Sequence, residues 1–170
     1  MSKLWQKTTN VNKLVENFTV GRDRELDRQM AAFDVLGSLA HTTMLQSIGL
    51  MGADDLVLVQ RELKAIYADI EQDNFTIEDG VEDVHSQVEM LLTQRIGDAG
   101  KKIHSGRSRN DQVLVDLKLF FRHQLQQVVQ ETDKLFRQLI ELSEQHKDVL
   151  LPGYTHLQVA MPSSFGLWFG

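Results

Sequence analysis

The chain has 170 residues, no cysteine and a formal net charge of −6, and 42% of its residues are hydrophobic. This hydrophobic content is sufficient for a buried core and excludes a largely disordered protein, while the acidic balance excludes a general nucleic-acid binder, which needs a positive surface. No apolar stretch approaches the ~20 residues that span a bilayer, and the N-terminus MSKLWQKTTN contains no apolar signal segment. We therefore expect a soluble cytoplasmic protein without disulfides or membrane contact.

Helical periodicity dominates the first hundred residues. The first twenty-odd residues are expected to form an extended arm, with at most one short amphipathic turn around Leu14 and Phe18. Apolar residues then recur at spacings of three and four, which predicts helices over about 27–48, 54–73 and 82–96. The residues expected to face the core are Met30, Phe33, Leu36, Ala40, Met44 and Ile48, then Leu56, Val59, Leu63, Ile66 and Ile70, and finally Val84, Val88, Leu91 and Leu92.

The rest of the chain contains one very long helix. Residues 97–108 are predicted to be an ordered loop, the alternative being a solvated linker. Residues 109–146 contain neither proline nor glycine, and their apolar stripe predicts a rod of roughly 55 Å. One small domain cannot cover such a stripe, so we expect packing in a bundle with other subunits. A further helix begins after Pro162.

The predicted fold class is therefore all-α. Residues 1–106 are expected to form a helical N-terminal domain with its extended arm. Residues 107–170 would contribute the first long helix, and the start of the next helix, of a central bundle domain.

The first segment that does not resemble packing sequence is GKKIHSGRSRNDQ, residues 100–112. It gathers basic side chains at the head of the long helix, in a chain that is otherwise acidic. Basic donors and a helix N-terminus can together hold a carboxylate or phosphate. The alternative is a solvated basic turn in which Asn110 or Asp111 caps the helix. The basic or histidine residues are Lys101, Lys102, His104, Arg107 and Arg109.

The second unusual segment is PGYTHLQVAMP, residues 152–162, in which Thr155 and His156 lie between the only two prolines of the chain. Histidine has an ordinary pKa of ~6.5, so it can exchange protons near neutral pH. A single loop histidine is more often structural or simply exposed, and both interpretations of His156 remain open at this point.

A third group, Glu82, Asp83, His85 and Glu89, lies on the helix predicted over 82–96. His85 and Glu89 are four residues apart and share a helix face, whereas Asp83 and His85 do not. Zinc sites use two histidines or cysteines at such spacings, and the segment offers neither, so we expect no metal here. Surface polarity or a hydrogen-bond network is the expected role.

Together the two loops resemble the argininosuccinate lyases of the fumarase/aspartase superfamily. The resemblance rests on HSGRSRNDQ, followed 45 residues after its asparagine by GYTHLQVAMP. Family-like blocks also occur at Leu4 and Trp5, at FDVLGSLAH (33–41) and at EDVHSQVE (82–89).

The resemblance implies an all-α homotetramer whose active sites are shared between subunits. The implied reaction is the reversible β-elimination of argininosuccinate to arginine and fumarate, without a cofactor. It implies that His156 is the catalytic acid or base, that Asn110 and Thr155 bind substrate with Arg109 and Ser108 beside them, and that Asp83 and His85 support the site.

Two positions depart from the family pattern. The family commonly has WGGRF near its start, where this chain reads WQKTT, and Asp23 stands where the family has a substrate-binding serine. The glycine- and serine-rich loop that supplies the family's catalytic serine has no match in residues 1–170, so we expect the 170-residue chain alone to be inactive. The alternatives are another superfamily lyase, acting on adenylosuccinate or aspartate, and a non-catalytic crystallin-like helical protein.

Overall fold

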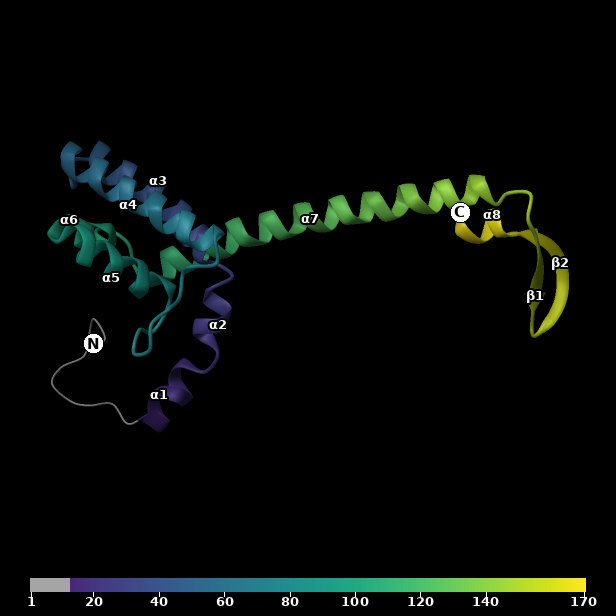
Figure 1. Ribbon diagram of the computed structural model, residues 1–170, viewed down its shortest axis with the longest axis horizontal. Helices are drawn as coiled ribbons and strands as arrows, with labels where there is room; N and C mark the ends of the chain where they lie inside the picture. The colour runs from purple at the N-terminus through teal and green to yellow at the C-terminus, as the bar shows by residue number, and fades with distance from the viewer. Residues whose placement is uncertain (1–12) are drawn as a thin grey trace. The chain divides into compact units, whose positions relative to one another are not determined.

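The structure is a computed structural model that describes residues 13–170, in two compact units that divide between Phe120 and Phe121 (Figure 1). Leu4, Trp5 and the WQKTT segment lie outside the described residues. From residue 13 onward the expectation of an extended arm is wrong, because the chain forms α1 (Lys13–Val20) and α2 (Asp23–Asp27). No helix within residues 13–170 combines the length and hydropathy needed to cross a membrane.

Three helices form the body of the first unit, as the periodicity predicted: α3 (Ala31–Ser47), α4 (Ala53–Glu71) and α5 (Val84–Ile96). Helices α3 and α4 pack side by side (Figure 1). Asp83 caps α5 by accepting a hydrogen bond from the Ser86 backbone N–H at 2.8 Å. The helix ends at Gly97, whose φ of 63° is unfavourable for residues with a side chain.

The predicted core faces of α4 and α5 are confirmed, and that of α3 is wrong. Val59, Leu63 and Ile66 are completely buried, as are Val84 and Leu92. On α3, in contrast, Leu36, Met44 and Ile48 are exposed. The helix is rotated relative to the prediction because its buried face includes polar groups that bind partners elsewhere in the unit. That face consists of Ala31, Asp34, Val35, Ser38, Thr42 and Leu45.

The segment predicted as a loop over 97–108 is ordered, but most of it is helical. It forms α6 (Asp98–Lys101) and the 3-10 turn η1 (Lys102–His104). Helix α6 lies so close to α5 that a Cβ added at Gly100 would approach the Leu92 carbonyl carbon to 2.6 Å. Only glycine permits this approach.

The long helix α7 (Arg109–Gln145) has 37 residues and confirms the predicted rod. Beyond Phe120 its apolar side chains are largely uncovered within the described chain. Phe121, Leu125, Val128, Val129, Leu135, Phe136 and Ile140 are all at least half exposed.

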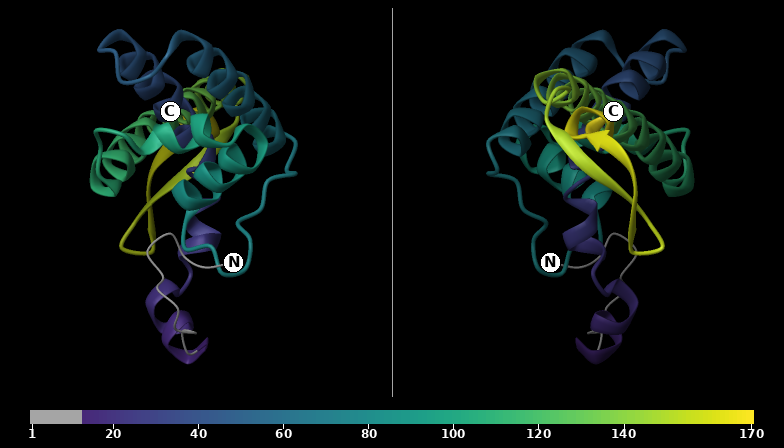
Figure 2. Two further views of the ribbon diagram at one scale, coloured as in Figure 1. Left: turned by 90° about the vertical axis from the view of Figure 1, so that its left-hand side faces the viewer. Right: turned by 90° about the vertical axis from the view of Figure 1, so that its right-hand side faces the viewer.

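The second unit contains a β-hairpin, which the sequence did not predict, within a fold that is otherwise helical as predicted. Strands β1 (Leu150–Thr155) and β2 (Gln158–Ser164) pair antiparallel, with Pro152 opposite Pro162, and form a twisted ribbon (Figure 2). Helix α8 (Phe165–Phe169) then begins after Pro162 as predicted, with Ser164 as its cap. The Ser143 hydroxyl of α7 donates to the Gly166 carbonyl at 2.7 Å and holds α8 against the long helix. The fold is mostly helical, with one small two-stranded sheet.

Candidate functional site

Ser108 caps the head of α7, in place of the two residues expected to do so. Its hydroxyl accepts a hydrogen bond from the Asp111 N–H at 3.3 Å, while the Ser108 N–H donates to the Asp111 carboxylate at 2.8 Å. Asp111 thus reciprocates the cap, in the arrangement of a capping box. These bonds with Ser108 hold the pKa of Asp111 below its ordinary value. The start of the helix is fixed by its own first turn.

The basic residues of the 100–112 segment are paired within the first unit. Each of them lies next to an acid or a hydroxyl group, and the Lys101–Asp98 pair remains largely exposed to solvent. Lys101 pairs with Asp98 at 2.7 Å, Lys102 with Asp55 at 2.5 Å, His104 with Glu89 at 3.5 Å and Arg109 with Asp83 at 2.5 Å, and Arg107 donates to the Ser38 hydroxyl at 3.0 Å.

Arg109 connects the head of α7 to the start of α5. One guanidinium nitrogen lies 2.5 Å from the Asp83 carboxylate, and another donates to the Ser86 hydroxyl at 3.0 Å. Because Asp83 also caps α5, one carboxylate fixes both helix starts. The guanidinium of Arg109 is therefore largely occupied by protein groups.

Asn110 lies at the same helix head but is not bonded to the described residues around it. Its side chain is exposed and makes no hydrogen bond with any residue of the described chain. Ser108 and Arg109 on either side are both engaged, so the helix start presents the Asn110 amide on a fixed backbone.

His85 is buried in the interior of the first unit. Its Nδ1 atom lies 2.8 Å from Asp34 Oδ1 and 3.7 Å from Asp116 Oδ2. Burial lowers the pKa of His85, but the hydrogen bond to Asp34 and the nearby carboxylates more than offset this, so the pKa is raised overall. Asp83 and His85, neighbours in the sequence, hold two different networks.

The sequence reasoning missed Asp34 and Asp116. Both are buried, and each interrupts an apolar run, FDVL and LVDL, which is the signal that could have identified them. Asp34, His85 and Asp116 offer ligand atoms within 4.8 Å of one another, a set that in principle could hold a cation. However, Gln112 donates to Asp34 at 2.5 Å, and the Arg107 guanidinium already supplies positive charge to both carboxylates. The set fits a charge-balanced network better than a metal centre.

Thr155 and His156 lie at the tip of the hairpin. Thr155 pairs with Gln158, which leaves His156 and Leu157 as a two-residue turn. Both turn residues have positive φ, 46° and 64°, a conformation that usually requires asparagine or glycine. Such strain concentrates at functional sites. The His156 side chain is exposed and available for chemistry.

The candidate residues thus form two groups in separate units. Ser108, Arg109 and Asn110 gather at the head of α7 with Asp83, and His85 lies in the buried network of the same unit. Thr155 and His156 belong to the second unit.

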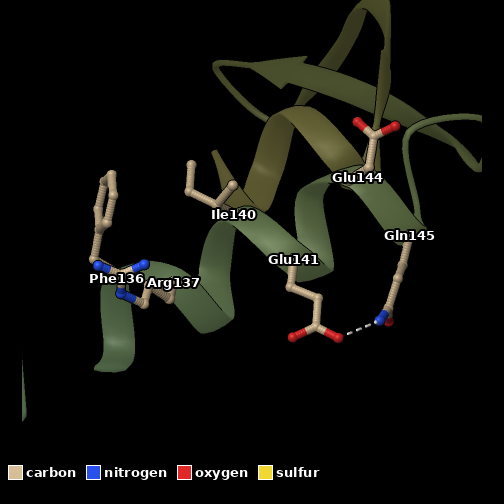
Figure 3. A pocket seen from close by; sticks show the side chains of 6 residues that line it. All are labelled: Phe136, Arg137, Ile140, Glu141, Glu144 and Gln145. Atoms are coloured by element: carbon tan, nitrogen blue, oxygen red, sulfur yellow. Dashed lines mark hydrogen bonds between the residues drawn. The ribbon is translucent and has the colours of Figure 1, made fainter. Parts of the chain in front are cut away.

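A hollow on α7 is a poor alternative site. Figure 3 shows its lining residues, which all project from one helix: Phe136, Arg137, Ile140, Glu141, Glu144 and Gln145. Glu141 and Gln145 bond to each other at 3.0 Å. The hollow contains no residue of either candidate group, and its exposed Phe136 and Ile140 fit a packing surface instead.

Comparisons with known proteins agree on one family. A family model described as Lyase matches residues 2–170. An argininosuccinate lyase of Phocaeicola vulgatus is 64% identical over 168 residues, which are 99% of this chain and 38% of that protein. An argininosuccinate lyase of Stenotrophomonas maltophilia is 41% identical over 98% of the chain and 39% of its own length. The chain thus spans about two fifths of the length of these curated relatives.

A solved structure shows the same fold at low sequence identity. A variant of EDDS lyase with bound fumarate matches with a TM-score of 0.65 and 21% identity, over 96% of this chain and 32% of that one.

Proposed function

The chain belongs to the lyase family, and from this premise we propose that the protein is an argininosuccinate lyase. This carbon–nitrogen lyase would cleave argininosuccinate reversibly into arginine and fumarate, as a step of arginine biosynthesis. The observation that carries the proposal is the 64% identity to an argininosuccinate lyase over 168 residues, a span that includes both unusual segments.

The chemistry assigns separate tasks to the two groups of residues. A β-elimination needs a base for the carbon-bound proton, donors for the carboxylate on which charge develops, and an acid for the departing nitrogen. We assign the acid or base role to His156, whose imidazole is exposed at the hairpin tip. Thr155 and Asn110 would bind substrate, and no cofactor is needed.

Arg109, Ser108 and Asp83 would act mainly by holding Asn110. The Asp83–Arg109 ion pair and the Ser108 cap immobilise the backbone on both sides of the exposed amide. A fixed donor or acceptor orients a substrate without an entropic cost at the moment of binding. Arg109 would therefore act indirectly, through the position of Asn110, and not by direct contact with the substrate.

We further propose a cytoplasmic homotetramer with active sites shared between subunits. The exposed apolar residues of α7 support this assembly, because a stripe of this length needs partner helices. We place the boundary between the N-terminal domain and the bundle at residues 106 and 107, just before the cap of α7.

Turnover by the purified full-length protein tests the proposal. Argininosuccinate should yield fumarate and arginine in equal amounts, with chelator present and no metal or nucleotide added. Adenylosuccinate and aspartate are the matched alternative substrates. Faster turnover of either one would assign the protein to another lyase of the superfamily, and inactivity toward all three would favour a non-catalytic helical protein.

A further inference from the structure

Four buried or half-buried ionisable groups from four segments meet between α3, α5 and the head of α7. They are Asp34 on α3, His85 on α5, Arg107 before α7 and Asp116 on α7. The carboxylates are almost inaccessible, with exposures of 0% for Asp34 and 1% for Asp116. We call these four residues the buried cluster.

Hydrogen bonds are distributed unequally over the two carboxylates. Asp34 Oδ1 makes two hydrogen bonds. It accepts one from Gln112 Nε2 at 2.5 Å, and the other joins it to His85 Nδ1 at 2.8 Å. Asp34 Oδ2 and both oxygens of Asp116 accept none from the residues that the structure describes. An ionised carboxylate with two buried, unbonded oxygens is costly, because it has lost hydration without replacement.

The Asp116 carboxyl group is tightly packed and cannot move away from Asp34. A Cβ placed on Gly37 would lie 3.2 Å from Asp116 Oδ1, so the carboxyl group packs directly against the backbone of α3. The residue is confined there next to a second carboxylate. Two carboxylates that share a site resolve their repulsion by retaining one proton between them.

We propose that Asp116 is a carboxylic acid that donates its proton to Asp34, and that this hydrogen bond positions the head of α7 against α3. The two carboxyl groups offer oxygens within 4.8 Å of each other, and one proton held between them supplies a donor that the unbonded oxygens otherwise lack and removes one of the two buried negative charges. The remaining charge of Asp34 then faces Arg107, and also His85 where that ring is protonated. Burial, together with the charge of Asp34, raises the pKa of Asp116 to about 7, against the opposing effects of His85 and Arg107.

The groups that act on Asp116 come from every element packed around it. They are Asp34 from α3, His85 from α5 and Arg107 from the segment before α7. Asp83 acts in turn on His85, and Glu89 on Arg107.

The direction of the pH dependence follows from this proton. Between the ordinary value of 3.8 and about 7, the folded protein binds a proton on Asp116 that the unfolded chain releases. The free energy of unfolding contributed by Asp116 therefore falls as the pH rises through this window. The change amounts to at most about tenfold in the unfolding equilibrium per pH unit.

Two isosteric variants of the full-length protein, Asp116→Asn and Asp34→Asn, separate the roles of the carboxyl groups. An asparagine at 116 keeps a donor toward Asp34 and cannot ionise. We expect Asp116→Asn to retain wild-type stability near pH 4 and to become progressively more stable than wild type up to pH 7. Asp34→Asn removes the charge that balances Arg107, and should raise the unfolding equilibrium constant at least tenfold throughout.

Infrared difference spectroscopy provides an independent readout. The carbonyl stretch of a protonated carboxyl group should appear in the wild type below neutral pH, shift on isotopic labelling of aspartate, and vanish in Asp116→Asn. Asp54→Asn, a change at an exposed aspartate of α4, is the control for both measurements.

The inference is wrong if Asp116→Asn costs as much stability as Asp34→Asn, if it fails to fold while Asp54→Asn folds, or if the carbonyl band survives in it. Neither measurement requires substrate. An enzyme inactive toward argininosuccinate would therefore leave this test intact, and a failed test would not affect the proposed reaction.

Discussion

Asp83 accepts the first-turn N–H of α5 on one carboxylate oxygen and holds the Arg109 guanidinium 2.5 Å from the other. A single side chain thus joins the start of α5 to the start of α7. The two bonds can be removed one at a time, because asparagine keeps the capping oxygen and alanine removes both.

We expect Asp83→Asn to destabilise the protein less than Asp83→Ala. The difference should be about 1 kcal/mol, the usual contribution of an N-cap side chain. Chemical unfolding of the purified variants measures it. Ser86→Ala is the control, since it removes a bond to Arg109 but leaves the cap in place. Equal losses in the two Asp83 variants would mean that the cap contributes little.

His156→Asn tests the proposed catalytic role without disturbing the hairpin. Asparagine tolerates positive φ well, so the turn should be retained. If His156 is the acid or base, kcat should fall by about 10²- to 10⁴-fold with KM little changed. Steady-state kinetics on argininosuccinate check this, with Leu157→Asn as the control for a change at the neighbouring turn position. A near-normal kcat would reduce His156 to a structural role.

Gly100→Ala should strongly destabilise the first unit. The added Cβ would lie 2.6 to 2.8 Å from backbone atoms of Leu92 and Thr93, so α6 must move away from α5. We expect a loss of about 1–3 kcal/mol, as for other overpacked sites. Thermal unfolding measures the loss. At Gly52 the nearest atom would be 3.5 Å away, so Gly52→Ala should cost much less.

The contributions of His85 and His41 to the free energy of unfolding should change with pH in opposite directions. The pKa of His85 is raised above the ordinary 6.5, so its stabilisation is present below pH 6.5 and is lost as the pH rises through the folded value. Burial lowers the pKa of His41, whose ring bonds the Ser105 carbonyl at 2.8 Å, so its contribution is lost as the pH falls below 6.5.

The corresponding variants can be compared directly. The His85→Asn variant should lose less stability than wild type as the pH rises. The His41→Asn variant should lose less than wild type as the pH falls. Unfolding midpoints measured across this pH range distinguish them. Variants with parallel pH profiles would contradict both assignments.

The exposed apolar face of α7 should drive self-association. Replacing Phe136 and Ile140 by serine should shift the full-length protein toward smaller species in size-exclusion chromatography with light scattering. Gln138→Ala, on the same helix, should leave the assembly unchanged. An unaltered mass for the double variant would place the subunit contacts elsewhere.

The comparison between α3 and α4 shows what could be predicted from the sequence. On α4 the core face consists of Val59, Leu63 and Ile66, and simple periodicity identified it. On α3 the buried face contains Asp34 and Ser38, which bond to Gln112 and Arg107 at distant positions in the sequence. Periodicity cannot reveal such partners, so the prediction chose the wrong face.

The same limit applies to the hairpin and the site. The turn His156–Leu157 lacks the asparagine or glycine that identifies tight hairpins in a sequence, so the strands were not predicted. The basic residues of the 100–112 segment were correctly identified as unusual, but Lys102 pairs with Asp55, 47 positions away. Local sequence cannot show whether a charge is already satisfied. Asn110 and His156 were identified through a family resemblance.

The two prolines of the chain face each other across the hairpin, Pro152 opposite Pro162. Each strand of a two-stranded sheet has an outer edge on which a strand from another molecule could add. Proline has no N–H to offer such a strand, and here both edges carry one at the same level. Neither edge of this hairpin can therefore pair fully with a strand from another molecule at that level, which opposes the joining of hairpins into an extended sheet.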